Sequence, residues 1–600
     1  MLEEVLDIPF ERVRLRHHGY LHAQSGEEEC RVSLIQELDS LLVTYAMRAK
    51  STLTCPARCA NDCLNRRTAG NPLKIQHPES AMKRTLTLAL LAATLTPLVV
   101  GAETAPRRLS REALRDKIKG AWAGQMIGVA YGAKTEFRAK GVMFESEIKP
   151  EPLTNAIQQD DLYVEMTFAR VLDTVGLDAT SADFGAAFKD SRYQLWHANA
   201  AARRNLGRGI APPLTGQPRY NAHADDIDFQ IEADFIGIMC PGLPQTSNQI
   251  CDRVGRVMNH GDGLYGGMFV AGMYAAAFFE TDPRAVVAAG LACIPSGSAY
   301  ARLISDVMSW SQQHPEDWRV VWRLLEEKWD VNDPCPDGAL NPFNIDAKLN
   351  GAFIALGLIY GRNDWQRTME VATRCGQDSD CNPSSAEGVL GAMLGYAKLP
   401  ESYRHELAAI ADTKFQFTDY SFNEIVQSTE RRALAMIQRA GGKVTETEVV
   451  IPRQAPRAPA LEQCNFGKPV KLVELGAAEW TWRGTWRIEK DQRFTDDAGS
   501  EAELRFNGTG VALVGPMSPQ GGRADVFVDG RKLELMADAY AGPGIHDNDL
   551  WRVFELAPGE HTLRLVTRAD ADPQSKGKAI GLRHAVIYAP IAATSGVPRR

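Results

Sequence analysis

Two pairs of aspartates stand where helical patterns begin, and such pairs can bind a hard cation. Asp160 and Asp161 precede the apolar-periodic segment 162–172, while Asp378 and Asp380 lie in the segment GQDSDCNP. Carboxylate oxygens are the ligands that Mg²⁺ prefers, and two converging carboxylates repel each other unless a cation lies between them. The helix dipole alone also favours acids in a first turn, so each pair has an ordinary structural explanation as well.

A third acidic residue, Glu136, closes a glycine-rich segment and completes the candidate set. It follows Gly132 in the segment GVAYGAKTEF, where its carboxylate could reach into a cleft or stand on the surface. Asn382 and Pro383 predict that a helix starts just after the late aspartate pair, since Asn is a good N-cap and Pro fits the first helical position. The three acidic elements therefore all lie at predicted helix ends.

Small residues predict how the helices that carry these acids pack. Gly120, Gly124, Gly128 and Gly132 recur every four residues and fall close to one helix face. Each costs a helix about 1 kcal/mol relative to alanine, which close helix packing must offset. The segment 266–279 is apolar on all sides, as a central helix would be. Together these patterns predict a compact all-α domain over residues 109–445.

The remainder of the chain changes character after a proline-rich stretch. Three prolines within 451–459 predict an extended linker, which we place at 446–469. Residues 470–590 then alternate apolar and polar side chains in short runs with turn signals such as Asp529-Gly530. This pattern predicts an antiparallel β-sandwich, similar to the jelly-roll-like accessory domains of secreted carbohydrate-active enzymes.

Two further polar groups are candidates for substrate binding. Glu232 and Asp234 stand among apolar residues, unlike acids on a solvated face. His260 and Asp262 precede the apolar segment 266–279, in a loop position where ligand contacts are common. Capping and turn formation explain each pair about equally well.

The order of these motifs resembles that of the ADP-ribosylglycohydrolase family, whose members include the enzyme that reactivates dinitrogenase reductase. The shared features are a glycine-rich first helix that ends before an acid, an acidic pair opening the next helix, and a late G-x-D-x-D. The resemblance covers about residues 116–399. It implies an all-helical domain with one or two Mg²⁺ or Mn²⁺ ions. It implies four metal ligands and two catalytic residues: Asp160, Asp161, Asp378 and Asp380 as ligands, and Glu136 and Asp161 as catalytic groups.

The sequence departs from the family pattern at several oxygen positions. The family motif T-D-D-T is replaced here by Gln159 and Leu162 around the aspartate pair, and the family's Asp in the first helix is Val129. Cys381 stands where a Thr commonly follows the late pair. These changes predict a weaker metal site. They weaken the prediction of an ADP-ribosyl substrate more than they weaken the prediction of the fold.

An export signal is predicted well inside the chain. Residues 82–102 combine a short basic start, an apolar run of about 15 residues and small residues at the expected cleavage position. Residues 1–81 would then be an upstream translation artefact without ordered structure; an internal signal anchor is the alternative. The mature protein is expected to be periplasmic or extracellular, with no stable membrane span.

The bulk composition excludes little but argues against a nucleic-acid partner. The 600 residues carry a net charge of -8, without the basic excess that nucleic-acid binding favours. Three functions remain: a metal-dependent glycohydrolase acting on an ADP-ribosyl or related ribosyl substrate, a glycoside hydrolase acting on extracellular saccharides, or an inactive glycan-binding protein. The partner is thus a small molecule or a glycan, and the oligomeric state stays open.

Overall fold

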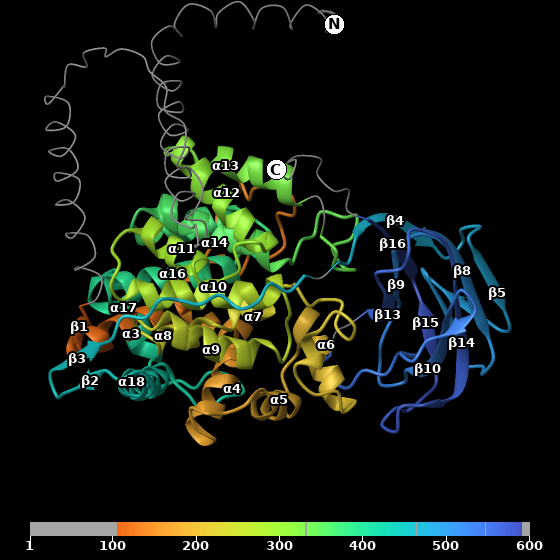
Figure 1. Ribbon diagram of the computed structural model, residues 1–600, viewed down its shortest axis with the longest axis horizontal. Helices are drawn as coiled ribbons and strands as arrows, with labels where there is room; N and C mark the ends of the chain where they lie inside the picture. Colours follow the sequence, from red (N-terminus) through yellow and green to blue (C-terminus); the bar gives the residue numbers. More distant parts are fainter. Residues whose placement is uncertain (1–104, 331–332, 464, 546–547, 591–600) are drawn as a thin grey trace, which may run out of the picture. The chain divides into compact units, whose positions relative to one another are not determined.

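The computed structural model describes residues 105–590 except 331–332, 464 and 546–547. Residues 1–81 and the predicted signal at 82–102 lie outside this part. The described chain begins with helices and ends with strands (Figure 1). None of the helices in this part combines the length and apolar character that a membrane crossing needs.

The helical part extends from Arg111 to Arg439. Its helices are α3 (Arg111–Gly132), α4 (Asp160–Thr174), α5 (Ser181–Lys189), α6 (His197–Gly207), α7 (Asp228–Ile231), α8 (Asp234–Ile238), α9 (Pro244–Gly255), α10 (Asp262–Ala277), α11 (Pro283–Leu291), α12 (Ala299–Gln313), α13 (Trp318–Trp329), α14 (Ala347–Gly361), α15 (Trp365–Arg374), α16 (Cys381–Leu394), α17 (Glu401–Ile410) and α18 (Phe422–Arg439). They share one hydrophobic core. The all-α prediction for this region is confirmed.

The glycine stripe of α3 packs directly on the backbone of α16. A Cβ at Gly124, Gly128 or Gly132 would collide with backbone atoms in and just before α16. The two helices therefore approach more closely than larger side chains would allow, which offsets the intrinsic cost of glycine in a helix. Because α3 runs into Glu136 and α16 begins just after Asp380, this contact brings the two acidic elements together.

The central helices α10 and α14 are buried along nearly their whole length. In Figure 1 they lie within the helical part, with α11 and α12 beside them. The apolar character predicted for 266–279 is thus confirmed as that of a core helix. Helix α16 is just as enclosed.

A small sheet closes the ends of the helical part. Strand β1 (Arg107–Ser110) pairs antiparallel with β3 (Glu448–Ile451), which also pairs with β2 (Lys443–Val444). Strand β3 falls inside the stretch 446–469 that the prolines predict to be a linker, so the extended segment proper begins after Ile451.

The C-terminal part is built from antiparallel sheets. Its strands are β4 (Lys468–Glu474), β5 (Trp480–Arg483), β6 (Arg487–Glu489), β7 (Gln492–Thr495), β8 (Glu501–Gly508), β9 (Gly510–Val514), β10 (Gly522–Val528), β11 (Arg531–Lys532), β12 (Ala537–Asp538), β13 (Asp549–Val553), β14 (Gly559–Ala571), β15 (Ile580–Leu582) and β16 (His584–Ala589). One sheet has the order β11-β10-β14-β8-β5, with β12 beside β10, and another the order β13-β9-β16-β4. Side chains of both sheets form one core, which confirms the prediction of antiparallel sheets.

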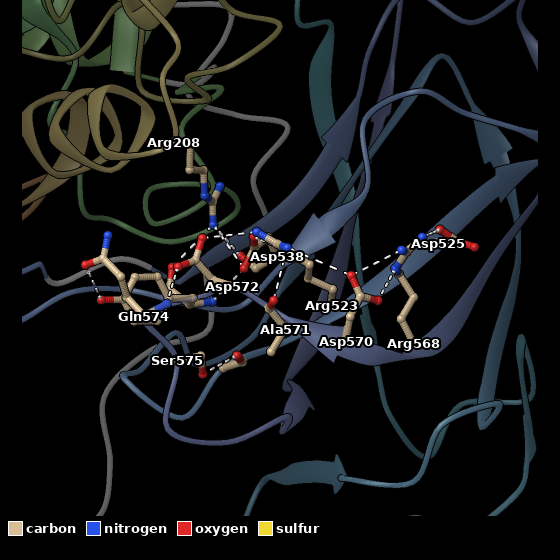
Figure 2. Close-up of polar contacts among 12 residues, drawn as sticks. Arg208, Arg523, Asp525, Asp538, Arg568, Asp570, Ala571, Asp572, Gln574 and Ser575 are labelled. Atoms are coloured by element: carbon tan, nitrogen blue, oxygen red, sulfur yellow. Dashed lines mark hydrogen bonds and ion pairs between the residues drawn. The ribbon is translucent and has the colours of Figure 1, made fainter.

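Arginine–aspartate pairs line one edge of this β-region (Figure 2). Arg523 on β10 donates to Asp538 at 2.8 Å and to Asp572 at 3.0 Å. Arg568 on β14 donates to Asp525 at 2.8 Å and to Asp570 at 2.7 Å. The acids of this edge are therefore neutralised by the fold itself.

Candidate metal centre and active site

A pocket of about 460 Å³ contains acidic side chains from several helix ends. Its lining includes Glu136, Asp160, Asp228, Asp378 and Cys381. These residues come from the loop after α3 and from the starts of α4, α7 and α16. The structure thus brings together the three acidic elements that the sequence singled out.

The loop before α16 is held in place by the loop after α3. The backbone N–H of Phe137 donates to the carbonyl of Gln377 at 2.9 Å, and the N–H of Gln377 donates to the carbonyl of Ala139 at 2.8 Å. Phe137 and Gln377 both have positive φ angles, 50° and 54°. Non-glycine residues rarely adopt this conformation, so the paired loops carry backbone strain next to the acids.

Helix α16 starts earlier than Asn382 and Pro383 predict. It begins at Cys381, so Asp380 occupies the N-cap position and Asn382 lies inside the helix. The Asp380 side chain makes no capping hydrogen bond. Asn382 instead donates to Asn350 Oδ1 at 2.9 Å, a long-range contact that no local pattern could reveal.

The aspartate pairs belong to a larger set of buried acids. Asp161, Glu165, Glu232, Asp234, Asp378 and Asp380 are all at most 3% exposed. Within the described residues, one carboxylate oxygen of each of four of these acids has no hydrogen-bond partner: Asp161 Oδ1, Glu165 Oε1, Glu232 Oε2 and Asp378 Oδ1. An ionised carboxylate that is buried without a partner lowers the stability of the fold. The unbonded oxygens therefore indicate that a metal ion binds here.

Burial and mutual repulsion raise the pKa values of these acids. Burial raises the pKa of Asp378 well above its usual range, and the nearby Asp380 adds to the effect. Burial, with the Asp161 charge next in importance, raises the pKa of Asp380 to about 7. Burial likewise raises the pKa of Asp234 to about 8, although hydrogen bonds from Tyr274 and Ser385 oppose it. Burial is the largest cause of each shift, and neighbouring carboxylates add to it at Asp378 and Asp380.

Glu136 differs from these acids because its side chain is exposed. Partial removal from water, followed by the charges of Asp380 and Asp160, raises its pKa to about 8. A carboxyl group that is open to the pocket and holds a proton near neutral pH is suited to general acid–base catalysis.

The replacements at the family's oxygen positions have visible consequences. The Cys381 thiol donates to Asp161 Oδ2 at 3.2 Å, so it bonds a predicted metal ligand. Sγ of Cys381 and carboxylate oxygens of Asp378 and Asp380 all lie within 4.8 Å of one another. The Gln159 amide, in the lining of the pocket, donates to Asn155 at 2.7 Å.

The residues predicted to bind substrate do not lie together in one pocket. Glu232 accepts a hydrogen bond from Asn199, which lines the acidic pocket. Asp234 lies deeper and accepts from the Tyr274 hydroxyl at 2.9 Å. His260 lines a separate, larger hollow of about 660 Å³ and lies 3.0 Å from Glu462. Asp262 accepts from the backbone N–H of Tyr300 at 3.2 Å.

The sequence reasoning placed Asp228 in an acidic cluster that could line the cleft, but it missed Glu165 and the capping role of Asp228. Glu165 lies one turn after Asp161 on α4 and accepts from the Phe235 N–H at 2.8 Å. Asp228 accepts from the N–H groups of Ala198 and Asn199 at the start of α6. An acid inside an otherwise apolar helix face was the available signal for Glu165. No local pattern marks Asp228 as a cap for a helix that begins thirty residues earlier.

The acidic set fits a bound divalent cation. The unbonded oxygens of Asp161 and Asp378 are hard donors, and Asp380 lies within reach of the same point. Asp160, Asp161, Asp378 and Asp380 would hold the ion, as the resemblance implies. The structure thus offers candidate metal ligands in Asp378 and Asp380, whose oxygens cluster with the Cys381 sulfur. The assignment of all four aspartates as ligands stays a prediction.

Comparisons with known proteins agree with this geometry. The family model described as ADP-ribosylglycohydrolase matches residues 110–436. A solved structure titled "ADP-ribosylglycohydrolase-related protein complex" is 16% identical and covers 54% of this chain and 99% of its own, with a TM-score of 0.34. That structural score is too low to carry an argument, so the family model carries the assignment.

Two curated relatives, both from Flavonifractor plautii, match shorter stretches. An "A type blood alpha-D-galactosamine galactosaminidase" is 36% identical over 96 residues, which is 15% of this chain and 9% of the relative. An "A type blood N-acetyl-alpha-D-galactosamine deacetylase" is 31% identical over 134 residues, which is 22% of this chain and 17% of the relative. The chain therefore matches only a small part of either relative.

The family match covers more than half of the chain and coincides with the helical part that holds the acidic pocket. It confirms the predicted family. The chain belongs to the ADP-ribosylglycohydrolase family.

Proposed function

We propose that this protein is a metal-dependent hydrolase of glycosidic bonds, with Mg²⁺ or Mn²⁺ held by Asp160, Asp161, Asp378 and Asp380. The observation that carries the proposal is the set of buried carboxylate oxygens without partners, next to a pocket whose rim bears Glu136. The four aspartates offer oxygen donors, which favour a hard cation of this kind.

The residues of the site divide the chemical work. A bound divalent ion would orient sugar hydroxyls and stabilise developing negative charge. Glu136 donates its proton to the leaving oxygen or nitrogen as the bond from the anomeric carbon to that atom breaks. A water molecule then adds to the anomeric carbon, and Glu136 takes the proton that this water loses. The buried Asp161 would be one of the residues that hold the ion, whereas the exposed Glu136 transfers the proton.

The lining of the pocket favours an uncharged sugar as substrate. Its described residues include four carboxylates and the aromatic side chains Phe137, Tyr163, Trp196 and Phe343, but no lysine or arginine. Lys140 lies 5.0 Å from the ring centre of Phe343 and is not part of the lining. Aromatic faces suit the apolar faces of sugars, whereas a diphosphate beside carboxylates would be repelled. One relative's name, a galactosaminidase, supports a saccharide substrate, here a sugar whose amino group is cationic near neutral pH.

The second candidate substrate is an ADP-ribosyl or related ribosyl group. The description of the family supports it. Its two phosphates would need the bound divalent ions to offset the carboxylates of the pocket. An inactive glycan-binding protein is the remaining alternative.

The basic and apolar pattern of residues 82–102 supports an exported protein, periplasmic or extracellular. An extracellular setting agrees with a saccharide substrate better than with an intracellular ADP-ribosyl group.

The test is hydrolysis by the purified chain with Mg²⁺ or Mn²⁺ and with chelator. The panel contains neutral aryl glycosides, aryl α-galactosaminides and ADP-ribosylated arginine. We expect metal-dependent release from a neutral glycoside, lost in Glu136→Gln and kept in Glu145→Gln, a matched change at an exposed acid in the following loop. Turnover of ADP-ribosylated arginine alone would select the second candidate. Binding of glycans without any turnover would select the third.

A further inference from the structure

A second group of metal-binding side chains lies beside the acidic pocket and has a different chemistry. We propose that His197, His223, Asp226 and Cys335 bind one transition-metal ion of the Zn²⁺ type. One ligand atom from each of the four lies within 4.8 Å of all the others. They come from the start of α6, the loop before α7 and the loop before α14, segments far apart in sequence. The assignment does not depend on the proposed hydrolase activity.

The arrangement around His223 distinguishes a metal site from a catalytic relay. Nδ1 of His223 lies 2.8 Å from Asp226 Oδ2 and 3.2 Å from the Cys335 sulfur. Nδ1 of His197 lies 3.8 Å from the same Asp226 oxygen. A Cys–His–Asp relay uses the two ring nitrogens on opposite sides, one for the thiol and one for the carboxylate. Here thiol and carboxylate meet the same nitrogen, as ligands around one ion do.

Burial gives an independent reason for an ion at this point. Asp226 and Cys335 are fully buried and His223 is 2% exposed. Within the described residues, Asp226 Oδ1 has no hydrogen-bond partner, although Oδ2 of the same group faces His223. A buried carboxylate oxygen without a hydrogen bond costs free energy. Coordination of a metal ion by the Asp226 carboxylate would remove that cost.

The surrounding backbone holds these ligands in place. Asn259 donates to the carbonyl of Asp226 at 2.9 Å. The Tyr588 hydroxyl, on β16, donates to the carbonyl of Pro334 at 2.8 Å, directly before Cys335. His197 has a φ of 44°, a strained value for a non-glycine residue at the first position of a helix. Preorganised ligands of this kind are what metal sites require.

The donor set identifies the class of metal. Two imidazole nitrogens, one thiolate and one carboxylate suit Zn²⁺, which favours four-coordinate sites of nitrogen and sulfur ligands. The four aspartates of the other site offer only oxygen and suit Mg²⁺ or Mn²⁺. The protein therefore separates two metals by ligand chemistry.

The zinc-type ion would support the wall of the acidic pocket. His197 lines that pocket, and its ring stacks on Phe343 at 5.7 Å with an interplanar angle of 28°. Phe343 is itself a lining residue. An ion that fixes the His197 ring fixes this aromatic wall, so the role is one of positioning.

The test uses Co²⁺ as a probe of the metal-stripped full chain. Cobalt bound to a thiolate gives a charge-transfer absorption that an all-oxygen site does not give. We expect this band to saturate at one equivalent, to be abolished by Zn²⁺ and to persist in excess Mg²⁺. Cys335→Ala should remove it, whereas Cys381→Ser, at the thiol beside the aspartate pairs, should keep it. Cys240→Ala changes another buried cysteine and serves as the folding control.

A milder variant keeps the test decisive if Cys335→Ala does not fold. His197 is partly exposed, with a side-chain exposure of 17%, so His197→Gln should leave the fold intact. Loss of a direct ligand should weaken Co²⁺ binding more than the roughly 10–100-fold that loss of a supporting residue costs. Absence of the band in the wild type would overturn the proposal. A band that survives Cys335→Ala and disappears in Cys381→Ser would also overturn it, because the ion would then lie among the aspartates.

Discussion

Asp378 in the helical part and Asp538 in the β-region are both almost fully buried, yet the fold treats their charges differently. Asp538 accepts a hydrogen bond from the Arg523 guanidinium at 2.8 Å (Figure 2). Asp378 forms no ion pair within the described residues, and its Oδ1 has no hydrogen-bond partner there. Instead it faces Asp380, Glu136 and Asp161, which raise its pKa further.

The contrast distinguishes acids that stabilise the fold through ion pairs from acids that are suited to bind a metal ion. A paired acid can be buried because its partner compensates for lost hydration. An unpaired buried acid lowers the stability of the empty protein, so its presence points to a cation from solution. The two regions of one chain therefore serve as internal references for each other.

The largest expected effect is on catalysis. Asp161→Asn keeps the size of the side chain but removes the charge of a metal ligand. We expect hydrolysis of the substrate found in the panel to fall by about 10²–10³-fold or more, as when a group that stabilises the transition state is removed. Steady-state kinetics at saturating Mg²⁺ measure this. Asp525→Asn, in the Arg–Asp edge of the β-region, is the control and should keep wild-type turnover.

The next effect concerns the helix contact that assembles the site. Gly128→Ala would push a methyl group against the Pro383 carbonyl of α16. Overpacking of this kind costs about 1–3 kcal/mol. Gly207→Ala lies in α6 with open space around it and should be neutral or stabilising, by about 0.4–1 kcal/mol. Denaturant unfolding of both variants measures the difference, and equal stabilities would refute the close packing of α3 on α16.

The comparison itself can be tested by a matched pair of changes in the presence of chelator. Asp378→Asn removes an unpaired buried charge and should stabilise the metal-free protein. Asp538→Asn removes the partner of Arg523 and should destabilise it by about 1–3 kcal/mol. Thermal unfolding of the two variants measures whether each change raises or lowers the stability of the protein. Destabilisation by both changes would mean that Asp378 has a partner in the fold after all.

The smallest effect is a difference in pH dependence. The folded-state pKa of Asp380 is about 7 and that of Asp234 about 8. Both exceed the value of about 4 in an unfolded chain. The folded helical part therefore retains protons that the unfolded chain has released. Without metal, the stability that these two acids contribute is fully present below about pH 4 and is lost as the pH rises to about 8.

The β-region should respond in the opposite direction. Hydrogen bonds from Arg568 and His561 lower the pKa values of Asp570 and Asp529, respectively. Their contribution is present above the unfolded pKa and is lost as the pH falls through the lowered values. Hydrogen exchange of each region, measured from about pH 2 to pH 8 with chelator, distinguishes the two trends. Parallel trends in both regions would contradict the assignment of unpaired acids to the helical part.

Periodic features of the sequence predicted the scaffold of the site well. Glycines every four residues predicted close packing of α3, and the structure shows that its partner is α16. Side-chain size at one helix face directly limits the distance between two helices. Asp160 and Asp161 were found because they stand beside the helix they start. Both signals are local, and local patterns can be recognised from the sequence without a structure.

Long-range contacts were out of reach of the same reasoning. His197, His223 and Cys335 meet only because three loops converge, and no spacing in the sequence records that meeting. The early start of α16 depends on Asn382 reaching Asn350 rather than capping its own helix. His260 was grouped with the substrate residues because of its loop position, and the structure places it in a separate hollow.

The most direct test of the central claim is a calorimetric titration of Mg²⁺ and Mn²⁺ into the metal-stripped wild type and an Asp378→Ala/Asp380→Ala variant. We predict saturable binding of one or two ions to the wild type and none to the variant, with both proteins folded by circular dichroism. Failure of the folded wild type to bind either ion would contradict the claim that its unpaired buried acids form a metal centre.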